Sequence, residues 1–106
     1  MISISELNKE TAKHYGYEAQ SNQLVEECAE LIQAVSKYRR ATVDVGQPLE
    51  DYKKTVALEN LIEEIADVEI MLEQIKYLLH IPEDELEAVK LFKVKRTRER
   101  IARKGA

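Results

Sequence analysis

The sequence predicts an all-α fold: an antiparallel, four-helix bundle-like protomer that spans residues 1–106 as one domain. Only three glycines and two prolines interrupt the 106 residues, and the composition is rich in residues that favour helices. Apolar residues recur at steps of three and four in several long stretches, which is the helical period. The connections between these stretches are short, as in antiparallel bundles. A chain of this length buries one core, and assembly with copies of itself would add burial.

A glycine separates the first two predicted helices. Ser3 and Glu6 form a capping-box pattern that starts the first helix, and Gly16 is expected to end it. A second helix should begin within residues 17–22 and end near Arg40. Its apolar stripe has steps of four, three, four and three, at Leu24, Cys28, Leu31, Val35 and Tyr38.

A loop and a long third helix follow. Residues 41–49 contain Gly46 and Pro48 and lack helical periodicity, so they are expected to form a loop. The third helix should begin within residues 50–58 and continue to residues 79–80. One of its faces carries Leu61, Ile65, Val68, Leu72, Ile75 and Leu79.

The fourth predicted helix changes from apolar to basic along one face. Pro82 and the three acidic residues after it are typical of a helix start, because acids face the positive end of the helix dipole. The helix should reach about Ala102. Its inward face carries Leu86, Val89 and Phe92, followed by Lys93, Arg96 and Arg100. Such a stripe suits phosphate binding; the alternative is a solvated basic helix end.

Charge and targeting patterns narrow the class of protein. Residues 1–89 carry 8 basic and 19 acidic side chains, whereas residues 90–106 carry 8 basic and 1 acidic. The acidity of the larger segment disfavours nucleic acid as a partner. No signal peptide and no apolar run of the ~18 residues needed to span a bilayer are apparent, so we expect a cytoplasmic protein without a membrane partner. The lone Cys28 is expected to be a small packing residue.

Two acidic motifs with the same spacing lie on consecutive predicted helices. Residues 26–30 read Glu-Glu-Cys-Ala-Glu, and residues 63–67 read Glu-Glu-Ile-Ala-Asp. At about 100° per residue, the second and last acids of each motif face the bundle. These inward acids are Glu27, Glu30, Glu64 and Asp67. The first acid of each motif, Glu26 or Glu63, faces away.

Four inward carboxylates would repel one another unless cations neutralise them. Oxygen ligands in this number suit Mg²⁺ or Mn²⁺. The alternative is that these acids edge the bundle and pair with lysines, as charges on helices usually do. A di-iron bundle needs Glu-x-x-His on two helices, but His14 and His80 are preceded at −3 by Thr11 and Tyr77.

With the two motifs in this order, followed by the Lys-Val-Lys-Arg run at 93–96, the chain resembles the MazG-like all-α nucleotide pyrophosphohydrolases. This superfamily includes dimeric dUTPases and dCTP pyrophosphatases. The resemblance covers most of the chain, from the second predicted helix to this run. It implies Mg²⁺-dependent hydrolysis of a nucleoside or deoxynucleoside triphosphate to the monophosphate and pyrophosphate. It also implies a homodimer or homotetramer with sites built partly from neighbouring subunits.

The resemblance implies roles for individual residues. It assigns metal binding and catalysis to Glu27, Glu30, Glu64 and Asp67. Glu26 and Glu63 would have an orienting role around the metal, and Lys93 and Arg96 would bind phosphates. In this hypothesis a water attacks phosphorus, and Glu27 or Glu30 accepts its proton.

The chain departs from the family pattern where the nucleobase should bind. It has no tryptophan and no clear base-recognition motif before the second helix. His14, Tyr15 and Gln20 are candidates by position only, and packing or capping roles are favoured for them. The rival function is a non-catalytic helical adaptor or nucleotide-binding regulatory protein. That rival predicts no saturable Mg²⁺ or Mn²⁺ site that depends on Asp67.

Overall fold

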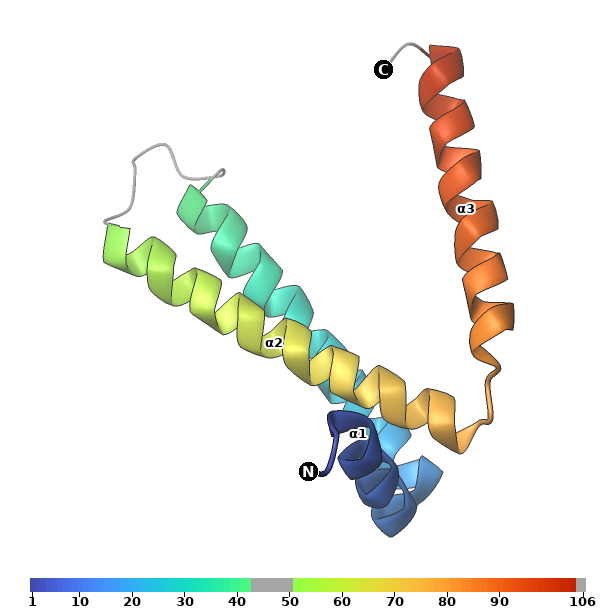
Figure 1. Ribbon diagram of the computed structural model, residues 1–106. Coiled ribbons are helices and arrows are strands. Elements are labelled where there is room, and N and C mark those ends of the chain that lie inside the picture. The colour runs from blue at the N-terminus through green and yellow to red at the C-terminus, as the bar shows by residue number, and fades with distance from the viewer. Residues whose placement is uncertain (43–50, 105–106) are drawn as a thin grey trace.

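The computed structural model describes residues 1–42 and 51–104 and confirms an all-α protein. Three helices and no strands make up this described part of the chain: α1 (Ile4–Thr42), α2 (Asp51–Leu78) and α3 (Glu83–Lys104), as Figure 1 shows. No helix within these ranges has the length and apolarity needed to cross a membrane. The predicted loop falls mainly on residues 43–50, outside the described residues, whereas residues 41 and 42 still belong to α1.

Gly16 divides α1 into two arms. The helix begins as predicted, because Ser3 Oγ accepts a hydrogen bond of 3.1 Å from the Glu6 backbone N–H. At Gly16 the backbone has φ 84° and ψ 171°, which is not helical. Glycine adopts a positive φ without strain from a side chain. We call residues 4–15 the N-terminal arm and residues 17–42 the long arm; the predicted break between two helices is therefore confirmed.

The long arm and α2 lie side by side and antiparallel (Figure 1). Their buried residues are small, polar or apolar: Gln20, Ala34, Ala41, Val68, Met71 and Gln74. Among the residues that the structure describes, the buried apolar ones are Ala12, Ala34, Ala41, Val68 and Met71. Val68 of the predicted stripes is buried as expected, whereas the other large side chains of these stripes are half-buried or exposed. Val35, Ile65 and Leu72 remain 43%, 42% and 44% exposed, respectively. One flank of this helix pair is therefore apolar and only partly covered.

A buried ladder of side-chain amides joins the N-terminal arm to the rest of the molecule. Gln20 Nε2 donates to Gln74 Oε1 at 2.6 Å, and Gln74 Nε2 donates to Asn8 Oδ1 at 3.0 Å. All three residues are buried. The ladder thus ties both arms of α1 to α2. Gln20 has a packing role here, whereas His14 and Tyr15 are exposed.

The turn from α2 into α3 has a well-defined local structure. The Ile81 N–H donates to the Lys76 carbonyl at 3.0 Å and the His80 N–H to the Tyr77 carbonyl at 3.2 Å, which is the Schellman pattern. His80 occupies the left-handed position, with φ 54°. Lys76 Nζ then pairs with Glu83 Oε1 at 3.1 Å, at the first residue of α3. The predicted helix restart after Pro82 is confirmed.

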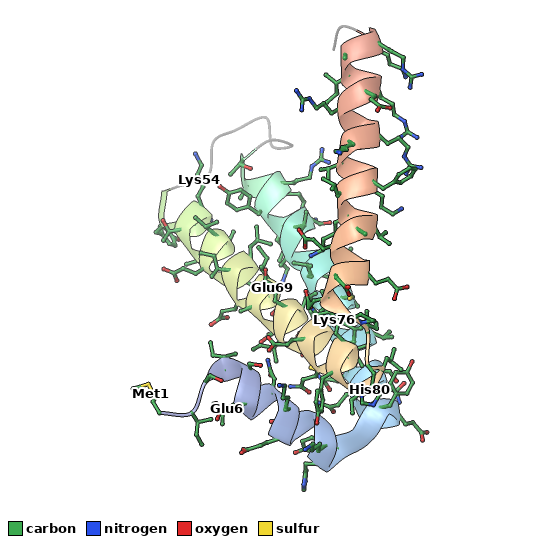
Figure 2. All side chains as sticks on the ribbon, turned by 45° about the vertical axis from the view of Figure 1, so that its right-hand side comes forward. Met1, Glu6, Lys54, Glu69, Lys76 and His80 are labelled. Atoms are coloured by element: carbon green, nitrogen blue, oxygen red, sulfur yellow. The ribbon has the colours of Figure 1, made fainter. Side chains whose placement is uncertain are left out.

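The third helix, α3, packs along neither α1 nor α2 in the described part of the chain. Most of its length stands clear of the other helices in Figures 1 and 2. Leu86 is half-buried, and the other described residues of α3 are exposed. Val89 and Phe92, expected to face inward, are 47% and 65% exposed. The single chain therefore does not form the expected four-helix bundle, because α3 does not pack along α1 or α2.

Candidate metal centre

Four acidic side chains meet at the seam between the long arm and α2. Glu27 and Glu30 project from the long arm, and Glu64 and Asp67 project from α2. Residues three apart on a helix lie on the same face, so each pair presents two carboxylates to the seam. One carboxylate oxygen from each of Glu27, Glu30 and Glu64 lies within 4.8 Å of the others.

The antiparallel arrangement pairs these acids across the seam. Glu64 lies close to Glu30, and Asp67 lies close to Glu27: after burial, the carboxylate across the seam is the next cause of the raised pKa of each α2 acid. The pair Gln20 and Gln74 of the amide ladder has the same helix register as the pair Glu27 and Asp67. Seven residues separate the two pairs on each helix. Seven residues are about two helical turns, so both contacts recur on the same face. The ladder therefore lies directly along the seam from the acids.

Two oxygens of the cluster have no partner. Glu27 Oε1 accepts a hydrogen bond of 2.8 Å from Gln23 Nε2, but Glu27 Oε2 is buried without a hydrogen bond. Glu64 Oε2 is buried and unpartnered as well. A buried carboxylate oxygen without a partner is costly. A hard divalent cation would satisfy both oxygens, so the residues present fit such an ion.

The electrostatics of the cluster agree with this fit. Burial raises the pKa of Glu64, and the carboxylates of Glu30, Asp67 and Glu27 raise it further. Burial also raises the pKa of Asp67, with Glu27 as the second cause. Among the described residues, no lysine or arginine forms an ion pair with any of these acids. The alternative interpretation, in which lysines neutralise them, therefore has no support in the described contacts.

Two other acids of the motifs lie outside the cluster. Glu26 and Glu63 are exposed, in agreement with their predicted outward position. Glu30 is also exposed, whereas Glu27, Glu64 and Asp67 are partly buried. The cluster is thus open to solvent on the Glu30 side and closed on the side of the helix seam.

The basic residues expected at the phosphates do not reach the acids within one chain. Lys93 and Arg96 belong to the exposed part of α3, and the Arg96 guanidinium lies over the Phe92 ring, 5.6 Å from its centroid. Arg100 is exposed on the same helix. Because α3 packs against neither α1 nor α2, the fold of a single chain separates these cations from the carboxylate cluster.

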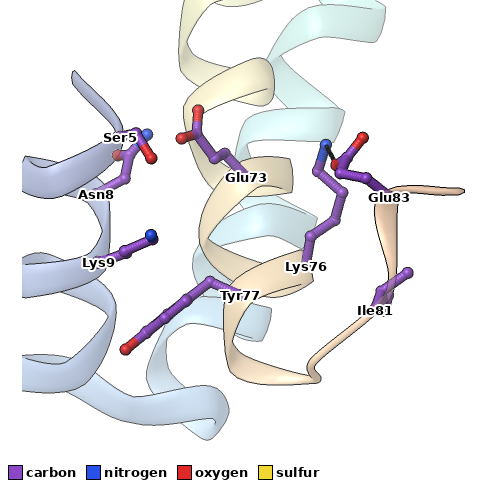
Figure 3. Close-up of a pocket in the computed structure, with 8 residues that line it drawn as sticks. All are labelled: Ser5, Asn8, Lys9, Glu73, Lys76, Tyr77, Ile81 and Glu83. Atoms are coloured by element: carbon purple, nitrogen blue, oxygen red, sulfur yellow. Dashed lines mark hydrogen bonds and ion pairs between the residues drawn. The ribbon is translucent and has the colours of Figure 1, made fainter. Parts of the chain in front are cut away.

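Sequence reasoning missed a cleft of about 290 Å³ between the N-terminal arm and the end of α2 (Figure 3). Its lining combines hydroxyl, amide, basic, acidic and aromatic groups: Ser5, Asn8, Lys9, Glu73, Lys76, Tyr77, Ile81 and Glu83. The Lys9 and Lys13 ammonium groups lie 5.8 and 5.9 Å from the centroid of the Tyr77 ring. The cleft exists only because the chain turns back at Gly16. The sequence predicts the break at Gly16 but not the direction in which the chain continues.

Comparison of the chain with protein-family models, with curated proteins and with solved structures finds no match.

Proposed function

We propose that this protein is a Mg²⁺-dependent nucleoside triphosphate pyrophosphohydrolase, which converts a nucleoside or deoxynucleoside triphosphate to the monophosphate and pyrophosphate. One observation carries the proposal. Carboxylates of Glu27, Glu30 and Glu64 converge across one helix seam, with Asp67 beside Glu27, and buried oxygens of Glu27 and Glu64 have no partner there. Such a cluster is the kind of oxygen-rich site that holds Mg²⁺ against phosphates.

In this proposal Glu27, Glu30, Glu64 and Asp67 hold Mg²⁺, and Mn²⁺ is an acceptable substitute because it also prefers oxygen ligands. The bound cation supplies Lewis-acid stabilisation of charge on the phosphate oxygens. The protein's own task is to keep four carboxylates in place, which the antiparallel helices do through their fixed register. Glu26 and Glu63, which point into solvent, act only on water around the site.

The reaction consumes one water and breaks the bond between the α- and β-phosphates. Oxygen from water joins one phosphorus, and the bridging oxygen leaves with the other product. The water's proton needs an acceptor, and Glu30 is the acid of the cluster most open to solvent. We assign this general-base role to Glu30, with Glu27 held by its hydrogen bond to Gln23.

The phosphates also need cations from the protein. Lys93 and Arg96 are the proposed phosphate-binding residues, because guanidinium and ammonium groups make charge-assisted hydrogen bonds to phosphate oxygens. A single chain keeps them apart from the acids, so the proposed enzyme is a homodimer or homotetramer.

Pyrophosphate release from a panel of nucleoside triphosphates tests the activity. Glu64→Gln and Asp67→Asn should each lower kcat about 100-fold or more, because each removes charge that stabilises the transition state. Glu63→Gln is the matched control, since Glu63 adjoins Glu64 in sequence but is exposed. It should lose little activity. Equal losses in Glu63→Gln and Glu64→Gln, or an inert folded protein that binds Mg²⁺, would exclude the proposal.

The exposed basic helix favours one rival, a binding protein without catalytic activity. In that case α3 would bind an anionic partner and the acid cluster would need no metal. Titration calorimetry with Mg²⁺ separates the two functions, because the rival predicts no saturable site lost in Asp67→Asn. Nucleic-acid binding would instead weaken steeply with salt and require Arg98 and Arg103.

A further inference from the structure

The cleft between the N-terminal arm and the end of α2 is separate from the acid cluster (Figure 3). Its described lining residues include none of the four clustered acids. On α2, Glu73 is the lining residue that comes first in the sequence, and it follows Asp67 by six positions, about 9 Å along the helix axis. The volume of about 290 Å³ is at the small end of the range for ligand pockets, about 300–1,000 Å³. The cleft therefore suits a small molecule.

The most deeply buried residue of this lining, Asn8, has a donor without an acceptor. Asn8 is 6% exposed, whereas the other lining residues are half-buried or exposed. Its Oδ1 accepts the hydrogen bond from Gln74 Nε2, but its Nδ2 is buried and has no partner among the described residues. The amide ladder donates in one direction, from Gln20 to Gln74 to Asn8, so it ends in this unpaired and polarised donor. A buried donor of this kind requires an acceptor, which a ligand oxygen at the inner end of the cleft supplies.

Positive charge lies on the same wall of the cleft. Lys9 and Lys13 are one turn apart on the N-terminal arm, and their ammonium groups lie 5.8 and 5.9 Å from the centroid of the Tyr77 ring. Figure 3 shows Lys9 pointing from this arm toward α2. Lys9 forms no ion pair within the described chain. A ligand group that both accepts hydrogen bonds and carries negative charge, such as a carboxylate, fits this wall.

The opposite wall carries an unpaired acid. Glu73 is half-buried on α2, one turn before Tyr77, and forms no ion pair with the described residues. The second acid of the lining, Glu83, is already paired with Lys76 at 3.1 Å. Glu73 thus leaves one negative charge for a cationic group of the ligand, such as an ammonium. Tyr77 and Ile81 add apolar surface to the lining.

We propose that this cleft binds a free α-amino acid with an apolar side chain. The ligand carboxylate accepts a hydrogen bond from Asn8 Nδ2 and faces Lys9, and the ligand ammonium faces Glu73. The ligand side chain lies against Tyr77 and Ile81. An α-amino acid carries both charges on one carbon, so it satisfies the two walls together, whereas a simple anion would meet repulsion from Glu73. This site is independent of the acid cluster and of the proposed function.

The first test is an NMR titration of the isotope-labelled full chain with L-leucine. Binding should be saturable and should shift the side-chain amide signals of Asn8, whereas those of the exposed Asn22 on the long arm should not move. Two analogues separate the charges, because L-leucinamide lacks the carboxylate and N-acetyl-L-leucine lacks the ammonium. The affinity for each analogue should be lower by about tenfold or more, since each loses a charge-assisted contact.

Charge changes in the cleft should alter this preference in a stated direction. Glu73→Gln should weaken L-leucine binding by about tenfold. Lys9→Glu should make L-leucinamide bind at least as tightly as L-leucine, because the new acid repels the carboxylate. Glu69→Gln is the matched control, since Glu69 is an exposed acid one turn earlier on α2 and does not line this cleft. It should bind L-leucine as the wild type does. Circular dichroism should show the wild-type helical content in all three variants, because the amide ladder is intact.

Several results would overturn the site. One is the absence of a saturable shift of the Asn8 signals with millimolar L-leucine or L-phenylalanine. Another is equal affinity for L-leucine and its two analogues, because the charges would then have no part in recognition. Inorganic phosphate that binds as tightly as L-leucine would indicate a plain anion site, and tighter binding of deoxycytidine or deoxyuridine would make the cleft part of a nucleotide site. An amino-acid-binding chain that hydrolyses no nucleoside triphosphate would refute the proposed function and leave this site standing.

Discussion

Replacing Gly16 with alanine tests the break in α1, because the sign of the change in the free energy of unfolding depends on whether Gly16 is helical. In the interior of a helix, alanine in place of glycine raises the free energy of unfolding by about 1 kcal/mol. Gly16 lies within the bounds of α1, but its φ of 84° and ψ of 171° place it in a region that almost only glycine adopts. Gly16→Ala should therefore destabilise the protein.

The magnitude follows from the surroundings of this residue. A Cβ at position 16 would meet no atom within 4 Å, so no clash adds to the cost. Backbone strain in this region costs about 1–3 kcal/mol. The smaller conformational freedom of alanine in the unfolded chain offsets about 0.4–1 kcal/mol. A net loss of about 1–2 kcal/mol in the free energy of unfolding is expected.

Urea unfolding followed by circular dichroism measures this loss. For a small domain it corresponds to a fall of roughly 0.5–1 M in the midpoint. Ala29→Gly, at an exposed position of the long arm, is a useful control that should cost about 1 kcal/mol as an ordinary helical glycine. Protein concentration and divalent cations must be held constant, because self-association and metal binding both change apparent stability.

A Gly16→Ala protein about 1 kcal/mol more stable than wild type would refute the reasoning. It would mean that residues 4–42 form one continuous helix. The N-terminal arm would then not return to α2, and the hydrogen bond between Asn8 and Gln74 would not exist.

Two further predictions concern the seam. The pKa values of Glu64 and Asp67 are raised in the folded chain, so without divalent cations the folded chain binds their protons more tightly than the unfolded chain does. Their contribution to stability is therefore present at acid pH. It is lost as the pH rises through the raised pKa values. Thermal melting in EDTA should show that stability falls as the pH rises. Asp67→Asn should make this fall smaller, and added Mg²⁺ should restore the lost stability. An equal pH dependence in the wild-type and Asp67→Asn proteins would contradict the prediction. Gln74→Leu should lower the free energy of unfolding by about 2–4 kcal/mol, because it leaves buried groups of Gln20 and Asn8 unpaired. Urea unfolding of Gln74→Leu and of the control Gln33→Leu, at an exposed position, measures this loss. Equal urea midpoints for the two variants would disprove the prediction.

Local patterns predicted the features that local chemistry determines. The cap at Ser3, the break at Gly16 and the restart after Pro82 each depend on a few neighbouring residues, and all three are present. The convergence of Glu27, Glu30 and Glu64 was also predictable. It needed only helical spacing and the antiparallel pairing of consecutive helices.

Features that depend on distant segments were not predictable in this way. A helical wheel shows which face of α3 is apolar, but not whether the same chain or another one covers it. The apolar stripes were expected to form the seam, yet of their large side chains only Val68 is buried among the described residues, beside polar or small residues such as Gln20 and Ala34. The amide ladder was missed for a related reason. Asn8 reaches Gln74 only after the chain reverses at Gly16.

The buried polar contacts between the long arm and α2 explain why the amide ladder and the acid cluster occur together. An apolar seam between two helices would tolerate a shift of register, whereas a buried polar pair permits only the register that satisfies its hydrogen bonds. The bond between Gln20 and Gln74 fixes that register two turns from the pairing of Glu27 with Asp67. A shift by one residue would separate the acids and leave the amides unpaired. The ladder therefore stabilises the one alignment in which the carboxylates meet, and it offsets part of the repulsion that their meeting creates.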